Sequence, residues 1–329
     1  MLRPLKFTVL LAALMLPGAT ALQASPDRWR AEGWKTDFSQ KTIEWPSVLS
    51  GGPPKDGIPS IDKPRFIATS AVTDLAPTEP VIGLTVNGEA RAYPLRVLMW
   101  HEIVNDTLGG VPVAITYCPL CNAAIVFDRR HDGRVLDFGT TGKLRNSDLV
   151  MYDRQTESWW QQFTGEGIAG EFAGQSLKML PSRLDAFARF VERNPDGQVL
   201  VPTNPGMRPY GRNPYTSYDS SVRPFLYNGA LPEGIEPMAR VIVVDGADGK
   251  PVAIEMAHLR ARKELKMDGV ELSWSPGQNS ALDTDRISRG RDVGNVMAQR
   301  NGKDVRYDVT FAFVFHAFHP DGRIVKGDG

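Results

Sequence analysis

Cysteine is nearly absent from this sequence, since its 329 residues contain only Cys118 and Cys121. Folds that depend on disulfides are usually small and rich in cysteine, so that class is excluded. An excess of charge of one sign is also lacking, because 38 basic residues balance 38 acidic ones. We therefore expect neither nucleic acid nor an anionic membrane surface as a partner. With 42% hydrophobic residues, the chain can bury a core without cross-links.

The hydrophobic run near the N-terminus is short. Residues 7–16 follow Arg3 and Lys6 and precede the small residues Ala19, Thr20 and Ala21. A run of this length is well below the roughly 20 residues that span a bilayer, and its flanks are typical of a secretory signal. We predict a signal peptide at 1–21, a mature chain from Leu22, and a periplasmic or secreted protein. Membrane attachment would arise only through this segment, if it stays uncleaved.

Turn signals dominate the remainder of the chain. The dipeptides favour type I′ turns between short β-prone runs; they are Asn87-Gly88, Asp132-Gly133, Asp248-Gly249, Asp268-Gly269, Asn301-Gly302 and Asp321-Gly322. Helical patterns are few, at 94–106, 182–195 and 253–266. The sequence therefore predicts a β-rich α+β fold built from hairpins.

Composition divides the chain into segments. After the signal, we expect an extended segment at 22–63, a first half at 64–193, a connection rich in Pro, Gly and Tyr at 194–237, and a second half at 238–329. Residues 81–124 align with 241–281, which places Pro119 and Asn122 on Pro276 and Asn279. We interpret the halves as a degenerate duplication. Because the second copy has no cysteine, the pair in the first copy serves chemistry or a local clip.

Three motifs carry a resemblance to a known family. They are WHEIVNDTLGG at 100–110, TYCPLCNAAIVFDR at 116–129 and FGTTGKLRNSDLVMYDRQTESWWQQFTGE at 138–166. From about Ile67 to the C-terminus, the chain resembles the bacterial and archaeal family catalogued as domain of unknown function 3179. The resemblance implies an exported or membrane-associated protein and brings no established activity.

The Cys-x-x-Cys pair has three physical uses, of which metal binding is the first. No second cysteine pair is present, so histidine would have to complete the site. His101 lies just before the hairpin that leads to the cysteines, and His316 and His319 are further candidates. Two thiolates with imidazole suit copper(I) or zinc. We predict Cys118, Cys121 and His101 as ligands of one copper or zinc ion.

The second use is thiol–disulfide exchange, and the third is a structural clip. A thioredoxin fold is not expected, because the residues after the cysteines read as a strand, an Asp-Gly turn and another strand rather than a long helix. A disulfide over so short a loop would restrict the unfolded chain little. Both uses remain alternatives to the metal.

Aromatic and charged residues cluster after the cysteines. Asp153, Arg154, Trp159 and Trp160 are candidate substrate-binding residues in a Trp-lined cleft, since Trp and Arg often grip ligands. Tyr117 and Asn122, which flank the cysteines, are candidates for hydrogen bonds around the site and for substrate binding.

The segment Gly139–Lys143 is too short for a phosphate-binding loop and has Leu144 where Ser or Thr should stand.

Taken together, these features of the sequence favour an exported metalloprotein, whether or not it is an enzyme. The alternatives are a redox protein, or a binding or assembly protein with a disulfide-clipped loop that uses the Tyr-rich residues 206–221 as a contact surface. Its partner would be a small molecule or a protein.

Overall fold

A computed structural model of the chain describes residues 25–327. Its architecture is β-rich α+β, with several small sheets and short helices, which confirms the predicted fold class. The predicted signal peptide lies outside the described residues. Within them, no helix has both the length and the apolar character needed to cross a membrane.

The first half contains two sheets, ordered β15-β3-β4-β16-β2 and β14-β7-β6-β5. A tight turn at Asn87 and Gly88, both with positive φ, joins β3 to β4, as the dipeptide predicts. The elements of this half are β2 (Arg65–Ala68), β3 (Pro80–Val86), β4 (Glu89–Pro94), α2 (Leu95–His101), β5 (Ile103–Leu108), β6 (Val111–Cys118), β7 (Ala123–Asp128), β14 (Met179–Leu180), β15 (Arg183–Ala186), α3 (Phe187–Arg193) and β16 (Gln198–Val201).

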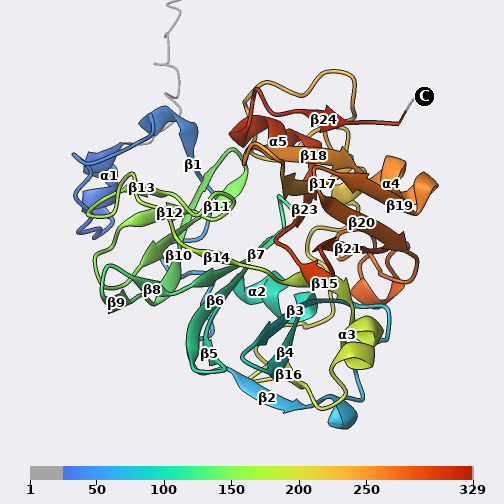
Figure 1. Cartoon of the computed structure of the whole chain (residues 1–329). Coiled ribbons are helices and arrows are strands. Elements are labelled where there is room, and N and C mark those ends of the chain that lie inside the picture. The colour runs from blue at the N-terminus through green and yellow to red at the C-terminus, as the bar shows by residue number, and fades with distance from the viewer. Residues whose placement is uncertain (1–24, 328–329) are drawn as a thin grey trace, which may run out of the picture.

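The second half forms sheets ordered β23-β17-β18-β24 and β19-β20-β21-β22. It occupies the upper right of Figure 1, in orange to red. Its elements are β17 (Arg240–Asp245), β18 (Pro251–Glu255), α4 (Met256–Arg262), β19 (Glu264–Met267), β20 (Val270–Ser275), β21 (Asn295–Arg300), β22 (Lys303–Asp304), β23 (Asp308–Phe311), α5 (Ala312–Phe318) and β24 (Ile324–Val325).

The two halves share more than the aligned segments. In each half, a hairpin is flanked by an antiparallel strand on one side and a parallel strand on the other: β15-β3-β4-β16 corresponds to β23-β17-β18-β24. The first helix of each half ends at a residue with positive φ, Glu102 (57°) or Lys263 (67°). This common order is what a duplication requires, and the duplication itself stays a prediction.

An insertion distinguishes the first half. Between β7 and β14 it adds β8 (Arg130–His131), β9 (Arg134–Val135), β10 (Phe138–Arg145), β11 (Asp148–Asp153), β12 (Trp159–Gln161) and β13 (Gly167–Ala169). In the second half, only the Asn301-Gly302 turn separates β21 from β22. The inserted sheet, ordered β1-β10-β11-β12-β13, lies at the left of Figure 1.

The segment expected to be extended at 22–63 is partly regular. It forms α1 (Pro26–Ala31) and β1 (Val48–Ser50), which lie against the insertion (Figure 1). Trp29, Trp34 and Phe38 bury their rings around Trp159, with ring centroids 4.8–5.2 Å apart. This aromatic cluster fixes the segment to the body of the protein.

Local patterns differ from the structure in several places. The helical patterns at 94–106 and 253–266 are helical only in part, because Ile103–Leu108 form β5, Pro251–Glu255 form β18 and Glu264–Met267 form β19. Residues 183–186, predicted as the start of a helix, form β15, because pairing with β3 overrides their helical pattern. Gln198–Val201 form the short strand β16 inside the connection, whose composition argues against long regular elements. Two of the six turn dipeptides depart from the type I′ pattern, since Asp248 and Asp321 do not have positive φ.

The short 3-10 helices are η1 (Trp45–Ser47), η2 (Thr69–Ala71), η3 (Tyr218–Ser220) and η4 (Ile287–Arg289).

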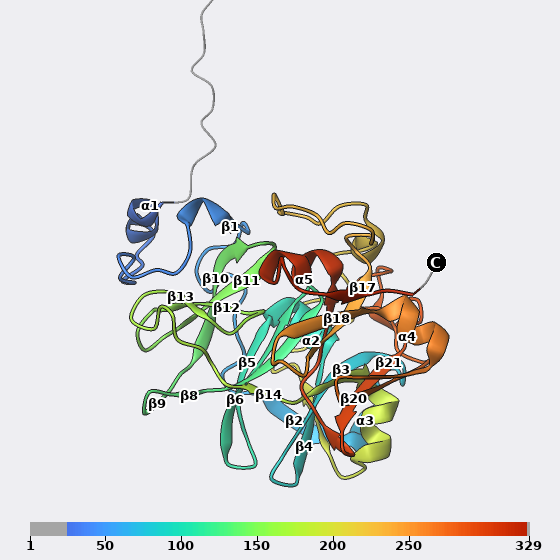
Figure 2. The same cartoon turned by 45° about the horizontal axis from the view of Figure 1, so that its top comes forward.

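The tyrosines of the connection between the halves pack on the protein, although Val222 and Phe225 in the same connection are 84% and 59% exposed. Tyr218 is 9% exposed and donates its hydroxyl to the carbonyl of Leu120. Tyr210, Tyr215 and Tyr227 also contact the core. Figure 2 shows part of this connection, in gold, beside α5 and β17. Its tyrosines therefore offer less contact surface than the sequence indicated.

Candidate metal centre

The two cysteines lie in a tight turn that joins β6 to β7. Cys118 ends β6 and pairs with Ala123, and the amide of Cys121 donates to the carbonyl of Cys118 at 3.2 Å. Asn122 closes the turn with a φ of 50°, which Asn tolerates better than most residues. The backbone thus directs both thiols to the same side of the loop, where both are buried.

The second half holds this loop in place. The Thr310 hydroxyl donates to the carbonyl of Cys121 at 2.7 Å, and the Asn122 amide group donates to the carbonyl of Val309 at 3.1 Å. Both partners belong to β23. The loop therefore lies at the junction of the two halves, and its shape depends on their packing.

A third donor comes from the insertion. Asn146 and Ser147, both with positive φ, form the turn between β10 and β11. The next residue, Asp148, brings its carboxylate to the cysteines. The ligand atoms of Cys118, Cys121 and Asp148 all lie within 4.8 Å of one another, and no other such group of three occurs within residues 25–327.

Only one of the two carboxylate oxygens of Asp148 has hydrogen-bond partners among the described residues. Its Oδ2 accepts from the side-chain amide of Gln161 at 2.6 Å and from the amide of Phe163 at 2.9 Å. Its Oδ1 is buried and has no hydrogen-bond partner among the described residues. Buried oxygens are almost always satisfied, so this atom calls for a ligand or for a proton, which the neighbouring thiols of Cys118 and Cys121 can supply.

Burial sets the electrostatics of the site. It raises the pKa of Cys118, raises that of Cys121 well above its usual range, and raises that of Asp148 to about 6. Desolvation disfavours all three anions. A cation at their centre would reverse this balance by replacing the thiol protons.

A second acid, Glu102, lies near these groups. It follows α2 and is 8% exposed. Burial and then the charge of Asp148 raise the pKa of Glu102 to about 8, and its charge in turn raises the pKa of Cys118. Glu102 was not among the residues predicted from the sequence, although it is the neighbour of His101 in WHEIVND.

His101 takes a different position from the one predicted. Its Nδ1 lies 2.7 Å from the carbonyl oxygen of Pro59 and its Nε2 lies 2.8 Å from the hydroxyl of Tyr210. Both ring nitrogens are engaged, and His101 is not part of the Cys–Cys–Asp group. The structure thus supplies Asp148 where the sequence indicated His101. The other candidates, His316 and His319, are also outside the group, and His319 packs on Phe163 and Phe315.

The predicted Trp-lined cleft is not formed by Trp159 and Trp160. Both side chains are fully buried, Trp159 in the aromatic cluster and Trp160 with its Nε1 donating to Asp153 at 2.8 Å. Arg154 donates to Asp62 at 2.8 Å, so it ties the N-terminal segment to the insertion. These residues stabilise the fold, because adjacent strand positions here are buried on both faces.

Tyr117 and Asn122 lie beside the cysteine loop, as predicted. The Tyr117 hydroxyl is buried and donates to Oδ1 of Asn122 at 3.4 Å. Asn122 in turn reaches Val309. These two side chains position the loop and do not point to a substrate.

A family model described as "Protein of unknown function (DUF3179)" matches residues 55–322. This range includes both halves, the cysteine loop, Asp148 and Glu102. No curated protein and no solved structure matches the chain.

Proposed function

The chain belongs to the DUF3179 family of proteins of unknown function, and for this member we propose that it is an exported protein that binds one metal ion through Cys118, Cys121 and Asp148. The observation that carries the proposal is the convergence of the two sulfurs and the carboxylate within 4.8 Å. Around a tetrahedral ion, two sulfurs at about 2.3 Å are about 3.8 Å apart, and a sulfur and an oxygen at about 2.0 Å are about 3.5 Å apart, so a contraction of about 1.3 Å at most would bring all three donors to one ion.

The donor set favours zinc. Carboxylate is a common ligand of zinc, whereas copper(I) selects thiolate and thioether donors. Because Asp148 takes the place of the expected imidazole, zinc becomes a better candidate than copper. Copper(I) remains the second candidate because two thiolates are retained.

Burial argues for an ion that is retained rather than one that turns over substrate. Cys118 and Cys121 are 2% and 0% exposed. Thiol exchange with another protein requires a sulfur that the partner can reach, so the redox alternative is less well supported. In an oxidising compartment, two adjacent thiols persist only if they are bound or shielded, and a metal ion would do both.

Metal analysis tests the proposal. Protein recovered from an exporting host should contain about one zinc per chain by mass spectrometry of the metals. Cys118→Ser and Asp148→Asn should lower metal retention during dialysis against a chelator, about tenfold or more for the carboxylate. His101→Ala is the matched control and should keep the metal, because its imidazole is engaged elsewhere. Metal-free protein with an intact Cys118–Cys121 disulfide would refute the proposal in favour of the clip.

A further inference from the structure

A cavity of about 560 Å³ opens beside the start of α2. Its walls come from β2, β16, the start of α2 and the proline-rich residues 202–210. In the lower part of Figure 1, β2, β4 and β16 lie side by side, and β16 pairs with both neighbours. The volume is within the range of about 300–1,000 Å³ that is usual for small-molecule sites.

Most of the wall is apolar. Leu75, Val97 and Leu200 are buried at 9%, 1% and 1% exposure, and Pro202 and Pro209 continue the lining. Such a surface favours a ligand with an apolar body. Proline also gives this part of the connection a restricted backbone.

The charged groups of the wall are three arginines and one carboxylate, Asp74, which pairs with Arg96. Arg65 and Arg208 line the cavity, and within residues 25–327 neither forms an ion pair. The Nε of Arg208 is buried without a hydrogen-bond partner among the described residues. By contrast, Arg96 is neutralised by Glu79 through two contacts of 2.5 and 2.9 Å. Two guanidinium groups are therefore available for an anion.

The rim beside Arg208 is held rigidly. The carbonyl of Pro59 can only accept, so Nδ1 of His101 carries the proton and its Nε2 accepts from the Tyr210 hydroxyl. The Tyr210 ring also stacks on the imidazole at 17°. His101 thus fixes Tyr210, which lines the cavity two residues after Arg208.

We propose that this cavity binds a small organic anion with an apolar body, such as a carboxylate or sulfonate, whose charged group lies between Arg65 and Arg208. The proposal does not depend on the metal centre. It gives His101 a role in positioning the rim of a ligand site.

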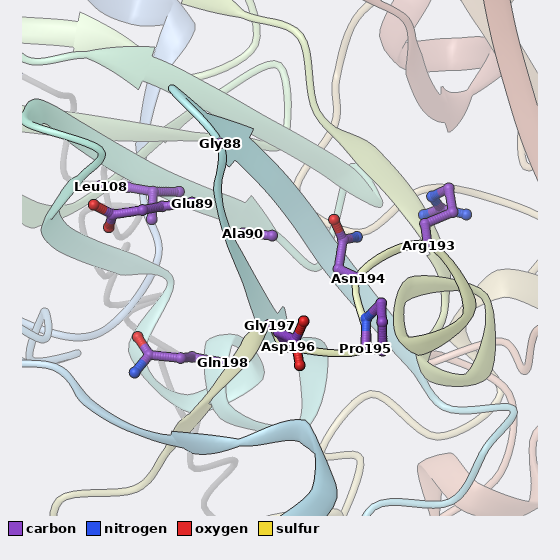
Figure 3. A pocket seen from close by; sticks show the side chains of 10 residues that line it. All are labelled: Gly88, Glu89, Ala90, Leu108, Arg193, Asn194, Pro195, Asp196, Gly197 and Gln198. Carbon is purple, nitrogen blue, oxygen red and sulfur yellow. The ribbon is translucent and has the colours of Figure 1, made fainter.

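A second pocket provides a contrast. It has a volume of about 510 Å³ and lies by the β3–β4 turn and the residues after α3, as Figure 3 shows. Its lining includes two carboxylates, Glu89 and Asp196, and one cation, Arg193, which already pairs with Asp185. No unpaired positive charge favours an anion there.

Two matched fluorescent probes test the proposal on the full metal-loaded protein. Anilinonaphthalene sulfonate and N-phenyl-1-naphthylamine share one apolar body, and only the first has an anionic group. We expect the sulfonate to bind one site at least tenfold more tightly. The double variant Arg65→Gln/Arg208→Gln should remove this preference, whereas Arg262→Gln, at an exposed position on α4, should keep it.

A filling variant locates the binding. Ile67→Trp, on β2 in the cavity wall, should abolish binding of both probes while circular dichroism shows a folded protein. Equal affinity for the two probes, an unchanged preference in the double arginine variant, or unchanged binding in folded Ile67→Trp would each overturn the proposal. His101→Ala should weaken sulfonate binding without loss of zinc, which separates this site from the metal centre.

Discussion

Replacing Glu102 by glutamine should flatten the dependence of stability on pH in the metal-free protein. The carboxyl is 8% exposed, and burial followed by the charge of Asp148 raises its pKa from 4.5 to about 8. Cys118 and Tyr215 are the other titratable groups near it. The folded state therefore holds a proton that the unfolded chain releases.

The sign and size follow from linkage. Below pH 4.5 both states are protonated and Glu102 has no cost. As the pH rises toward 8, the unfolded state loses its proton first, so the free energy of unfolding falls by up to about 1.4 kcal/mol per pH unit. Between pH 6 and 8 the loss amounts to about 2 kcal/mol, which is large beside a net stability of about 5–15 kcal/mol. Above pH 8 the loss levels off.

Urea denaturation at pH 6, 7 and 8, with chelator and reductant present, measures this effect. The difference between wild type and Glu102→Gln cancels the titration of the cysteines, and Asp148, with its pKa of about 6, contributes mostly below this window. Glu264→Gln, at an exposed position on β19, should keep the wild-type slope. A wild-type slope that persists in Glu102→Gln would refute the assignment of a buried, protonated acid next to Cys118 and Asp148.

Two further substitutions test the packing around the site. Gly142→Ala should destabilise the protein by roughly 3 kcal/mol or more, because its φ is 70° and a Cβ would lie 1.9 Å from the carbonyl oxygen of Pro53. The control Gly110→Ala, where φ is 77° and the space around the Cβ is open, should cost only about 1 kcal/mol. Thermal denaturation measures both changes. Asp219→Asn should lower the free energy of unfolding by about 3–5 kcal/mol, because its fully buried carboxylate pairs with two arginines. Asp285→Asn removes an exposed ion pair and should lower the free energy of unfolding by less than about 1 kcal/mol.

Local patterns predicted the parts of the fold that local physics controls. Asn87-Gly88 and Asp268-Gly269 form tight turns because Asn, Asp and Gly tolerate positive φ. The helix pattern at 182–195 was only half right, because residues 183–186 gain more from pairing with β3 than from helical geometry. Long-range pairing of this kind leaves little trace in a single sequence.

The residues of the candidate site could also be predicted only in part from the sequence. Cys118 and Cys121 stand out by rarity, whereas Asp148 lies 27 residues beyond Cys121 and reaches it only through the β10–β11 turn. One signal could have identified it: Asp148 opens the strand DLVMYD, all of which is buried, and a carboxylate in such a strand needs a partner. His101 was preferred because imidazole is the commoner metal ligand, and the sequence could not show that Pro59 and Tyr210 engage it.

The second half differs from the first at the candidate site. At positions that correspond to Cys118 and Cys121 it has Ser275 and Gln278, and in place of Glu102 it has Lys263, whose ammonium lies 3.9 Å from the ring centroid of Trp274. The backbone is nevertheless the same, since Tyr117 and Trp274 each donate their amide at 2.8 Å to the residue with positive φ.

The second half also lacks the insertion that supplies Asp148. All four acidic or thiol groups are thus absent together from a loop that folds without them. A disulfide clip would explain the two cysteines but neither the carboxylate nor the inserted hairpin that presents it. A bound cation would account for both cysteines and Asp148, because burial disfavours their anionic forms and positive charge between them would offset that cost.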